Sequence, residues 1–133
     1  MGTLLGFDYG TAKIGVAVGQ TVTATASALT TLYAKQQRPD WEQISKLIGD
    51  WEPEALVVGL PCDLDGTETE ITPRARRFAR QLEGRYRLPV HMADERLSSM
   101  VARQELKGRP IEYGDVDAMA AKLILETWLS EHA

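Results

Sequence analysis

The run LLGFDYGTAKIGVAVG, at residues 4–19, limits the possible folds of this chain more than any other stretch. Apolar residues on both sides of Gly10-Thr11-Ala12 predict two short strands, over residues 3–9 and 13–20, joined as a hairpin and buried on both faces. Asp8 lies inside this run, and burying an unpaired carboxylate costs several kcal/mol. We therefore expect Asp8 to have a partner, and that partner bears on function.

The middle of the chain predicts further strands and helices. The Thr-rich stretch at 22–33 suits a third strand of the same meander. Asp40 is the predicted N-cap of a helix, with Gln43 three residues on. The apolar run EALVVGLP, at 54–61, is typical of a buried central strand.

A second helix is predicted after a polar loop, with Thr72 as N-cap and Pro73 at its first position. The stretch LPVHMAD, at 88–94, predicts the last strand, and helices over about 97–107 and 116–131 end the chain. Helical spacing and size predict the following core residues: Trp41, Ile44, Leu47, Ile48, Trp51, Ala75, Phe78, Ala79, Leu82 and Trp128.

The resulting order, βββαβαβαα, predicts an α/β fold. Strands separated by helices should be parallel through right-handed crossovers, whereas the first three form an antiparallel meander. We therefore expect a single domain over residues 1–133. Its five-stranded mixed sheet would combine the three-strand meander with two parallel strands and carry helices on its faces.

Composition narrows the class of protein. The single cysteine, Cys62, excludes an internal disulfide and fits a cytoplasmic protein. We find neither a signal peptide nor an apolar stretch long enough to cross a membrane. The net charge is −4, yet residues 71–109 hold ten Lys and Arg against four Asp and Glu. A local positive face of this kind suits a nucleic-acid partner.

Three carboxylates occupy positions that packing alone does not explain. Asp8 ends the first strand, Glu95 follows the last strand, and Asp117 faces the sheet from the first turn of the last helix. If they meet at the carboxyl ends of the strands, their mutual repulsion calls for a cation. Mg²⁺ suits such ligands, and a pair of such ions can activate water against a phosphodiester.

Structural alternatives stay open for each group. Asp8 could accept main-chain hydrogen bonds in an Asx-turn at Gly10. Glu95 could form a surface ion pair with Arg96, and Asp117 is favoured in a first helical turn by the helix dipole. The arginines of the second helix, Arg76, Arg77 and Arg80, could be a solvated face or a track for phosphates.

Several motifs together resemble the YqgF family, whose members are described as pre-16S rRNA nucleases and as Holliday-junction-resolvase-like proteins. They are FDYGTAKIGVAVG, VVGLPCDLDGTET, ARRFARQL, ADERLSS and DVDAMAAKLILETWL, in this order along nearly the whole chain. The resemblance implies a ribonuclease H-like fold and a bacterial cytoplasmic enzyme. It also implies pre-16S rRNA as the partner, with processing of its 5′ end, and ribosomal particles as a further partner.

The resemblance also implies residue roles. Asp8, Glu95 and Asp117 would be catalytic and would bind one or two Mg²⁺ or Mn²⁺ ions. Gly10 and Gly15 would permit the tight hairpin beside the metal, and Arg96 would contact phosphate or steady Glu95. The chain departs from the family at Ala12, where a basic or polar residue is common, and in a short loop at 108–114.

The sequence is compatible with three functions. The first is metal-dependent hydrolysis of RNA. The second is resolution of branched DNA, for which a symmetric dimer would suit the two-fold substrate. The third is a non-catalytic module that binds nucleic acid or the ribosome. A nucleotide-binding loop like that of actin-like ATPases is set aside, because those enzymes need two such domains.

Overall fold

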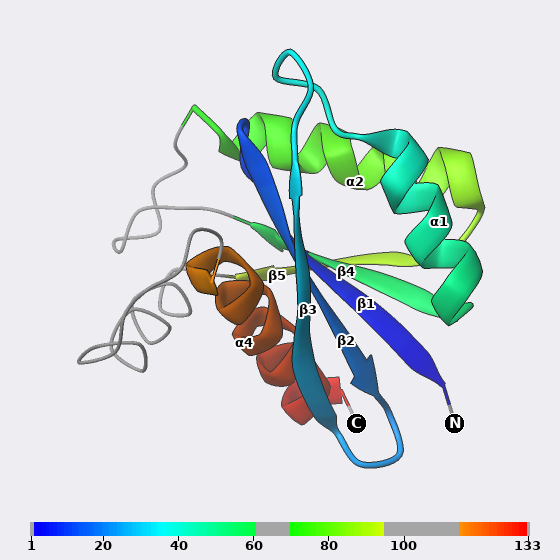
Figure 1. Cartoon of the computed structure of the whole chain (residues 1–133). Coiled ribbons are helices and arrows are strands. Elements are labelled where there is room, and N and C mark those ends of the chain that lie inside the picture. Colours follow the sequence, from blue (N-terminus) through cyan, green and yellow to red (C-terminus); the bar gives the residue numbers. More distant parts are fainter. Residues whose placement is uncertain (1, 61–69, 95–114, 133) are drawn as a thin grey trace.

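A computed structural model of the chain describes residues 2–60, 70–94 and 115–132 (Figure 1). These residues build one five-stranded sheet in the order β3-β2-β1-β4-β5. Its strands are β1 (Thr3–Asp8), β2 (Lys13–Gln20), β3 (Thr25–Tyr33), β4 (Ala55–Leu60) and β5 (Val90–Asp94). Its helices are α1 (Trp41–Trp51), α2 (Thr72–Tyr86) and α4 (Asp115–His132).

The sheet is mixed, as predicted. β1 pairs antiparallel with β2, and β2 pairs antiparallel with β3. β4 lies parallel to β1 on one side and to β5 on the other. The carboxyl ends of β1, β4 and β5, at Asp8, Leu60 and Asp94, therefore meet along one border of the sheet, here called the carboxyl edge.

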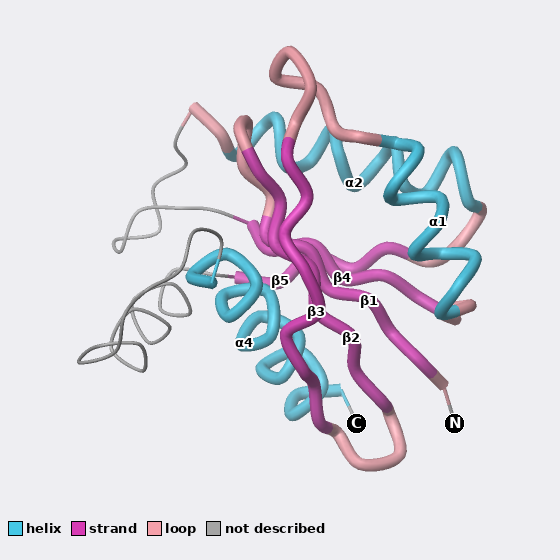
Figure 2. The backbone as a smooth tube through the Cα atoms, in the orientation of Figure 1, coloured by secondary structure: helices cyan, strands magenta, loops and turns pink. Residues whose placement is uncertain are grey.

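Two apolar cores lie on the two faces of the sheet. α1 and α2 cover one face and α4 covers the other (Figure 2). Leu5 and Phe7 belong to the core under α1 and α2, whereas Leu4 belongs to the core under α4. Neighbouring residues of β1 thus point into different cores, which explains why the middle of this strand has no polar side chain.

The start of α1 matches the predicted cap. The Asp40 side chain is buried and accepts a hydrogen bond from the main-chain N–H of Gln43 (3.3 Å). Gln43 Nε2 donates a second bond to Asp40 Oδ2 (3.0 Å), and Lys35 Nζ lies 3.6 Å from the same oxygen. Asp40 therefore satisfies a free main-chain donor at the start of the helix and has a partner for its charge.

An Asp40→Ala variant is expected to be about 1 kcal/mol less stable, because α1 would lose its N-cap acceptor. Urea denaturation followed by circular dichroism would measure this loss. The matched control is Glu42→Ala, since Glu42 is exposed in the first turn of the same helix. Equal stabilities of the two variants would contradict a capping role.

Some predicted boundaries are wrong. β3 begins at Thr25, not 22, and Val22 is 66% exposed in the preceding turn. Ile71, not Thr72, is the N-cap of α2, and Thr72 is a fully buried helical residue. Trp51 is 38% exposed at the end of α1, so it is not a core residue.

α4 packs against the sheet through its apolar side. None of the helices in the described part of the chain is long and apolar enough to cross a membrane.

Candidate active site

Asp8 is the last residue of β1 and is partly buried at the carboxyl edge. Side chains alternate along a strand, so Asp8 shares a face with Leu4 and Gly6. That face is the one under α4, because a Cβ added at Gly6 would lie 3.0 Å from Cβ of Leu125. The carboxylate of Asp8 therefore belongs to the α4 side of the sheet.

Asp117 lies in the first turns of α4, one helical turn before Ala121. Ala121 is fully buried against the sheet, and its carbonyl oxygen is 3.4 Å from the Cβ position of Gly6. Asp8 lies two residues after Gly6 on β1, and Asp117 lies about one helical turn before Ala121 on α4. Both offsets lead toward the carboxyl edge, and they bring the two acids to the same place.

The pairing of β1 with β2 gives the same result independently. Asp8 lies opposite Gly15 in the register of the two strands. A Cβ added at Gly15 would overlap the main-chain carbonyl of Asp117 and lie 2.9 Å from the nitrogen of Ala118. The backbone of α4 thus rests on β2 directly beside Asp8.

Lys13 lies beside Asp117, and the sequence did not predict it as a site residue. Lys13 Nζ lies 3.1 Å from Asp117 Oδ2, and the two side chains are 29% and 23% exposed. The sequence contains one signal that could have identified Lys13 as a site residue. It is a lysine at the start of the second strand, directly after the glycine turn. Because the two residues are far apart in the sequence, only the packing of α4 on β2 brings them together.

Glu95 and Arg96 lie outside the described residues. Asp94, which precedes Glu95, ends β5 opposite Leu60 at the carboxyl edge. Within the described ranges, which leave out residues 61–69 and 95–114, no group of three His, Cys, Asp or Glu side chains could hold a metal ion. The described part of the candidate site therefore consists of Asp8, Asp117 and Lys13.

The two glycines have different roles from each other. Gly10 lies in the connection between β1 and β2, where an added Cβ would be 2.6 Å from the carbonyl oxygen of Lys13. Gly15, which was predicted with Gly10 to permit the tight hairpin, is the third residue of β2. Its missing side chain instead lets α4 approach the strand closely.

The arginines of α2 border two different hollows. Arg76 and Arg80 border a hollow of about 240 Å³ beside β5, which Glu83 also lines. Arg77 borders a different and larger hollow of about 540 Å³, next to Tyr9. If these arginines bind phosphates, Arg76 and Arg80 would do so at one hollow and Arg77 at the other.

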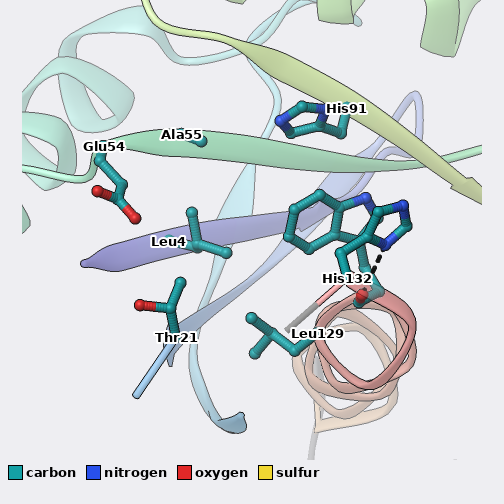
Figure 3. Close-up of a pocket in the computed structure, with 8 residues that line it drawn as sticks. Leu4, Thr21, Glu54, Ala55, His91, Leu129 and His132 are labelled. Carbon is teal, nitrogen blue, oxygen red and sulfur yellow. Dashed lines mark hydrogen bonds between the residues drawn. The ribbon is translucent and has the colours of Figure 1, made fainter. Parts of the chain in front are cut away.

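A third hollow, of about 270 Å³, lies at the opposite end of the sheet from the carboxyl edge (Figure 3). His91 and His132 both stack on Trp128, with ring centroids 4.8 and 4.2 Å away. His132 Nδ1 also donates a hydrogen bond to the main-chain oxygen of Trp128 (2.8 Å). These contacts account for both histidines as packing residues around the end of α4.

Known sequences resemble this chain over nearly its full length. A protein of Yersinia pestis (strain Pestoides F) described as "Putative pre-16S rRNA nuclease" is 50% identical over 135 residues, covering 98% of this chain and 96% of the relative. A protein of Yersinia pseudotuberculosis serotype O:1b with the same description matches to the same extent.

Solved structures share the fold. Thermus thermophilus RuvC in complex with a Holliday junction substrate matches with a TM-score of 0.56 and 16% identity, over 98% of this chain and 96% of RuvC. The Fowlpox virus resolvase bound to Holliday junction DNA matches with a TM-score of 0.59 and 10% identity, over 97% of each chain. Both have the ribonuclease H-like fold, which the resemblance to the YqgF family implied for this chain.

The family model of RuvX, described as Holliday junction resolvase, matches residues 2–131. Together with relatives of 50% identity that bear a nuclease name, this match covers the β1–β2 hairpin, the carboxyl edge and α4. The chain therefore belongs to the RuvX family of ribonuclease H-like nucleases.

Proposed function

We propose that this protein is a metal-dependent nuclease that hydrolyses phosphodiester bonds near the 5′ end of pre-16S rRNA. The observation that carries the proposal is the meeting of Asp8 and Asp117 at the carboxyl edge, on the α4 side of the sheet. Ligand sites of α/β sheets gather at this kind of edge. The names of the 50% identical relatives support RNA as the substrate, and such an enzyme would work in the cytoplasm.

The donor set fits a hard divalent cation. Asp8 and Asp117 offer carboxylate oxygens, which Mg²⁺ and Mn²⁺ prefer. A cationic group already lies at this position, since Lys13 Nζ is 3.1 Å from Asp117. We therefore expect Asp8, Asp117 and Glu95 to hold one or two Mg²⁺ or Mn²⁺ ions. When bound, the metal supplies charge stabilisation for phosphodiester hydrolysis.

The side chains of the protein have separate tasks in this proposal. Asp8 and Asp117 would hold the cation at the carboxyl edge, and Lys13 keeps the Asp117 carboxylate in place when no cation is bound. Gly15 has no side chain, so α4 can lie close to β2, and this distance determines the position of Asp117. Arg76, Arg77, Arg80 and Arg96 are proposed to bind phosphates of the substrate.

A second candidate function is the resolution of branched DNA. The description of the matching family as Holliday junction resolvase favours it. The two candidates share fold, metal and carboxylates, so only the substrate separates them. A protein that binds RNA or ribosomal particles without cleaving them is the remaining alternative.

The proposal predicts that the purified protein cleaves a 16S rRNA fragment with a 5′ extension in the presence of Mn²⁺ or Mg²⁺. EDTA is expected to abolish the cleavage, because the carboxylates then lack their cation. A four-way DNA junction, incubated side by side and analysed on denaturing gels, serves as the competing substrate.

The outcomes separate the three candidates. Cleavage of the RNA alone supports the processing nuclease, and cleavage of the junction alone assigns the protein to DNA resolution. If neither is cut while the RNA is bound, the proposal of a nuclease fails for these substrates and the binding module is favoured.

A further inference from the structure

The largest hollow among the three described above begins at the residue that follows Asp8 in the chain. It has a volume of about 540 Å³ and is bordered by the connection after β3, the start of α1 and one side of α2. The side chains that matter here are Tyr9, Arg38, Trp41, Arg74, Arg77 and Arg85. We call this hollow the arginine groove.

The charge of the arginine groove is of one sign. Four guanidinium groups line it, and no Asp or Glu is among its lining residues. All four arginines are exposed. The ion pairs found between described residues join Lys13 to Asp117 and Lys35 to Asp40, so they involve none of the four. Four cations that have no carboxylate partner among the described residues fit a ligand with several negative charges, such as a chain of phosphates.

Two aromatic rings in the same groove point to a ligand that also has flat faces. Tyr9 and Trp41 are partly exposed, and both pack on the buried ring of Phe78, with centroid distances of 5.1 and 5.6 Å. Arg85 lies over the ring of Trp41, 4.1 Å from its centroid. These contacts fix the rings before any ligand binds, and both the rings and the guanidinium plane can stack on unpaired bases.

The groove and the candidate active site meet at the end of β1. Because side chains alternate along the chain, Asp8 belongs to the α4 side and Tyr9 packs with Phe78 on the α2 side. The groove therefore reaches the carboxyl edge at Tyr9, directly after Asp8 in the chain, although the side chains of Tyr9 and Asp8 lie on opposite faces of the sheet.

We propose that the arginine groove binds a single-stranded segment of the nucleic-acid substrate, next to the phosphate that is cleaved. The four arginines contact its phosphates, and Tyr9 and Trp41 stack on its bases. This assignment rests on the proposed nuclease function for the identity of the strand. A base-paired strand does not fit equally well, since its bases are already stacked and cannot lie on the two rings.

The test is binding of a fluorescein-labelled RNA of eight nucleotides, measured by anisotropy in EDTA so that no cleavage occurs. Arg77→Gln is expected to weaken binding about tenfold and to reduce the slope of log K against log salt by about 0.7. Lys46→Gln is the matched control, because Lys46 is exposed on α1 and outside the groove. This control is expected to change affinity less than about twofold.

Two further variants separate the groove from a general positive surface. Arg87→Gln removes the same charge from the exposed end of the same helix, outside the groove, and a loss as large as that of Arg77→Gln would overturn the proposal. Tyr9→Leu is expected to weaken binding about tenfold, whereas Tyr9→Phe keeps the ring and the affinity. Equal affinity for the eight-nucleotide RNA and its duplex would also overturn the proposal.

The binding test and the cleavage test can fail separately. If the unchanged protein cleaves RNA with Mn²⁺ but Arg77→Gln and Tyr9→Leu bind normally, the groove assignment is wrong and the nuclease stands. If binding depends on the groove residues but no substrate is cleaved with any metal, the nuclease proposal fails while the groove assignment stands.

Discussion

An Asp8→Asn variant is expected to fold normally but to cleave RNA about a thousandfold more slowly than the unchanged protein. Asparagine has nearly the same shape, but it lacks the anionic oxygen that a divalent cation prefers. Loss of an outer partner of a metal ligand costs about 10–100-fold, so loss of a ligand itself should cost more. Single-turnover cleavage at saturating Mg²⁺, together with a thermal melt, would measure both effects.

This substitution also tests the structural explanation of Asp8. An asparagine can make the Asx-turn at Gly10 as well as an aspartate can, so a purely structural Asp8 would tolerate the change. Asp50→Asn is the matched control, since Asp50 is an exposed acid near the end of α1. Cleavage by Asp8→Asn at the rate of this control would remove Asp8 from the proposed metal site.

The central elements of the fold could be predicted because their signals are local. β2 spans Lys13–Gln20, the range that the apolar run predicted. Asp40 caps α1 as its spacing from Gln43 indicated. The stripe of α2 that contains Ala75, Phe78 and Leu82 is buried, because helical periodicity decides which side meets the sheet.

The ends of helices were harder to predict, because neighbouring structure decides them. The pair Thr72-Pro73 predicted a cap, yet α2 begins one residue earlier, with Ile71 as N-cap and no side-chain hydrogen bond. The helical stripe of α1 predicted a buried Trp51. This residue ends the helix just before Glu52, which takes a left-handed conformation, and the ring remains 38% exposed.

The candidate site depends on contacts that join distant parts of the chain. Asp8 and Asp117 could be singled out in the sequence, because each carboxylate interrupts an apolar pattern. Lys13 could not be assigned to them, since its partner lies on a helix at the other end of the chain. The arginine groove was missed for the same reason, because Tyr9, Arg38 and Arg77 come from three separate segments.

A Gly15→Ala variant is expected to lose about 3 kcal/mol of stability, at the upper end of the range for overpacked sites. The added Cβ would overlap the main-chain carbonyl of Asp117 and come within 2.9 Å of the nitrogen of Ala118. Both obstacles are backbone atoms of α4, which cannot rotate away as a side chain can. Relief therefore requires the start of α4 to move off β2, and urea denaturation would measure the cost.

Gly49→Ala provides the matched control, since no atom lies within 4 Å of its Cβ position on α1. The same chemical change should there raise stability by about 1 kcal/mol, because alanine favours a helix over glycine. Under conditions where Gly15→Ala remains folded, its cleavage rate should fall about a hundredfold, because Asp117 moves with α4 relative to Asp8. A Gly15→Ala protein of unchanged stability and activity would mean that α4 does not rest on β2 at this point. Loss of stability with full activity would separate this packing contact from the positioning of Asp117.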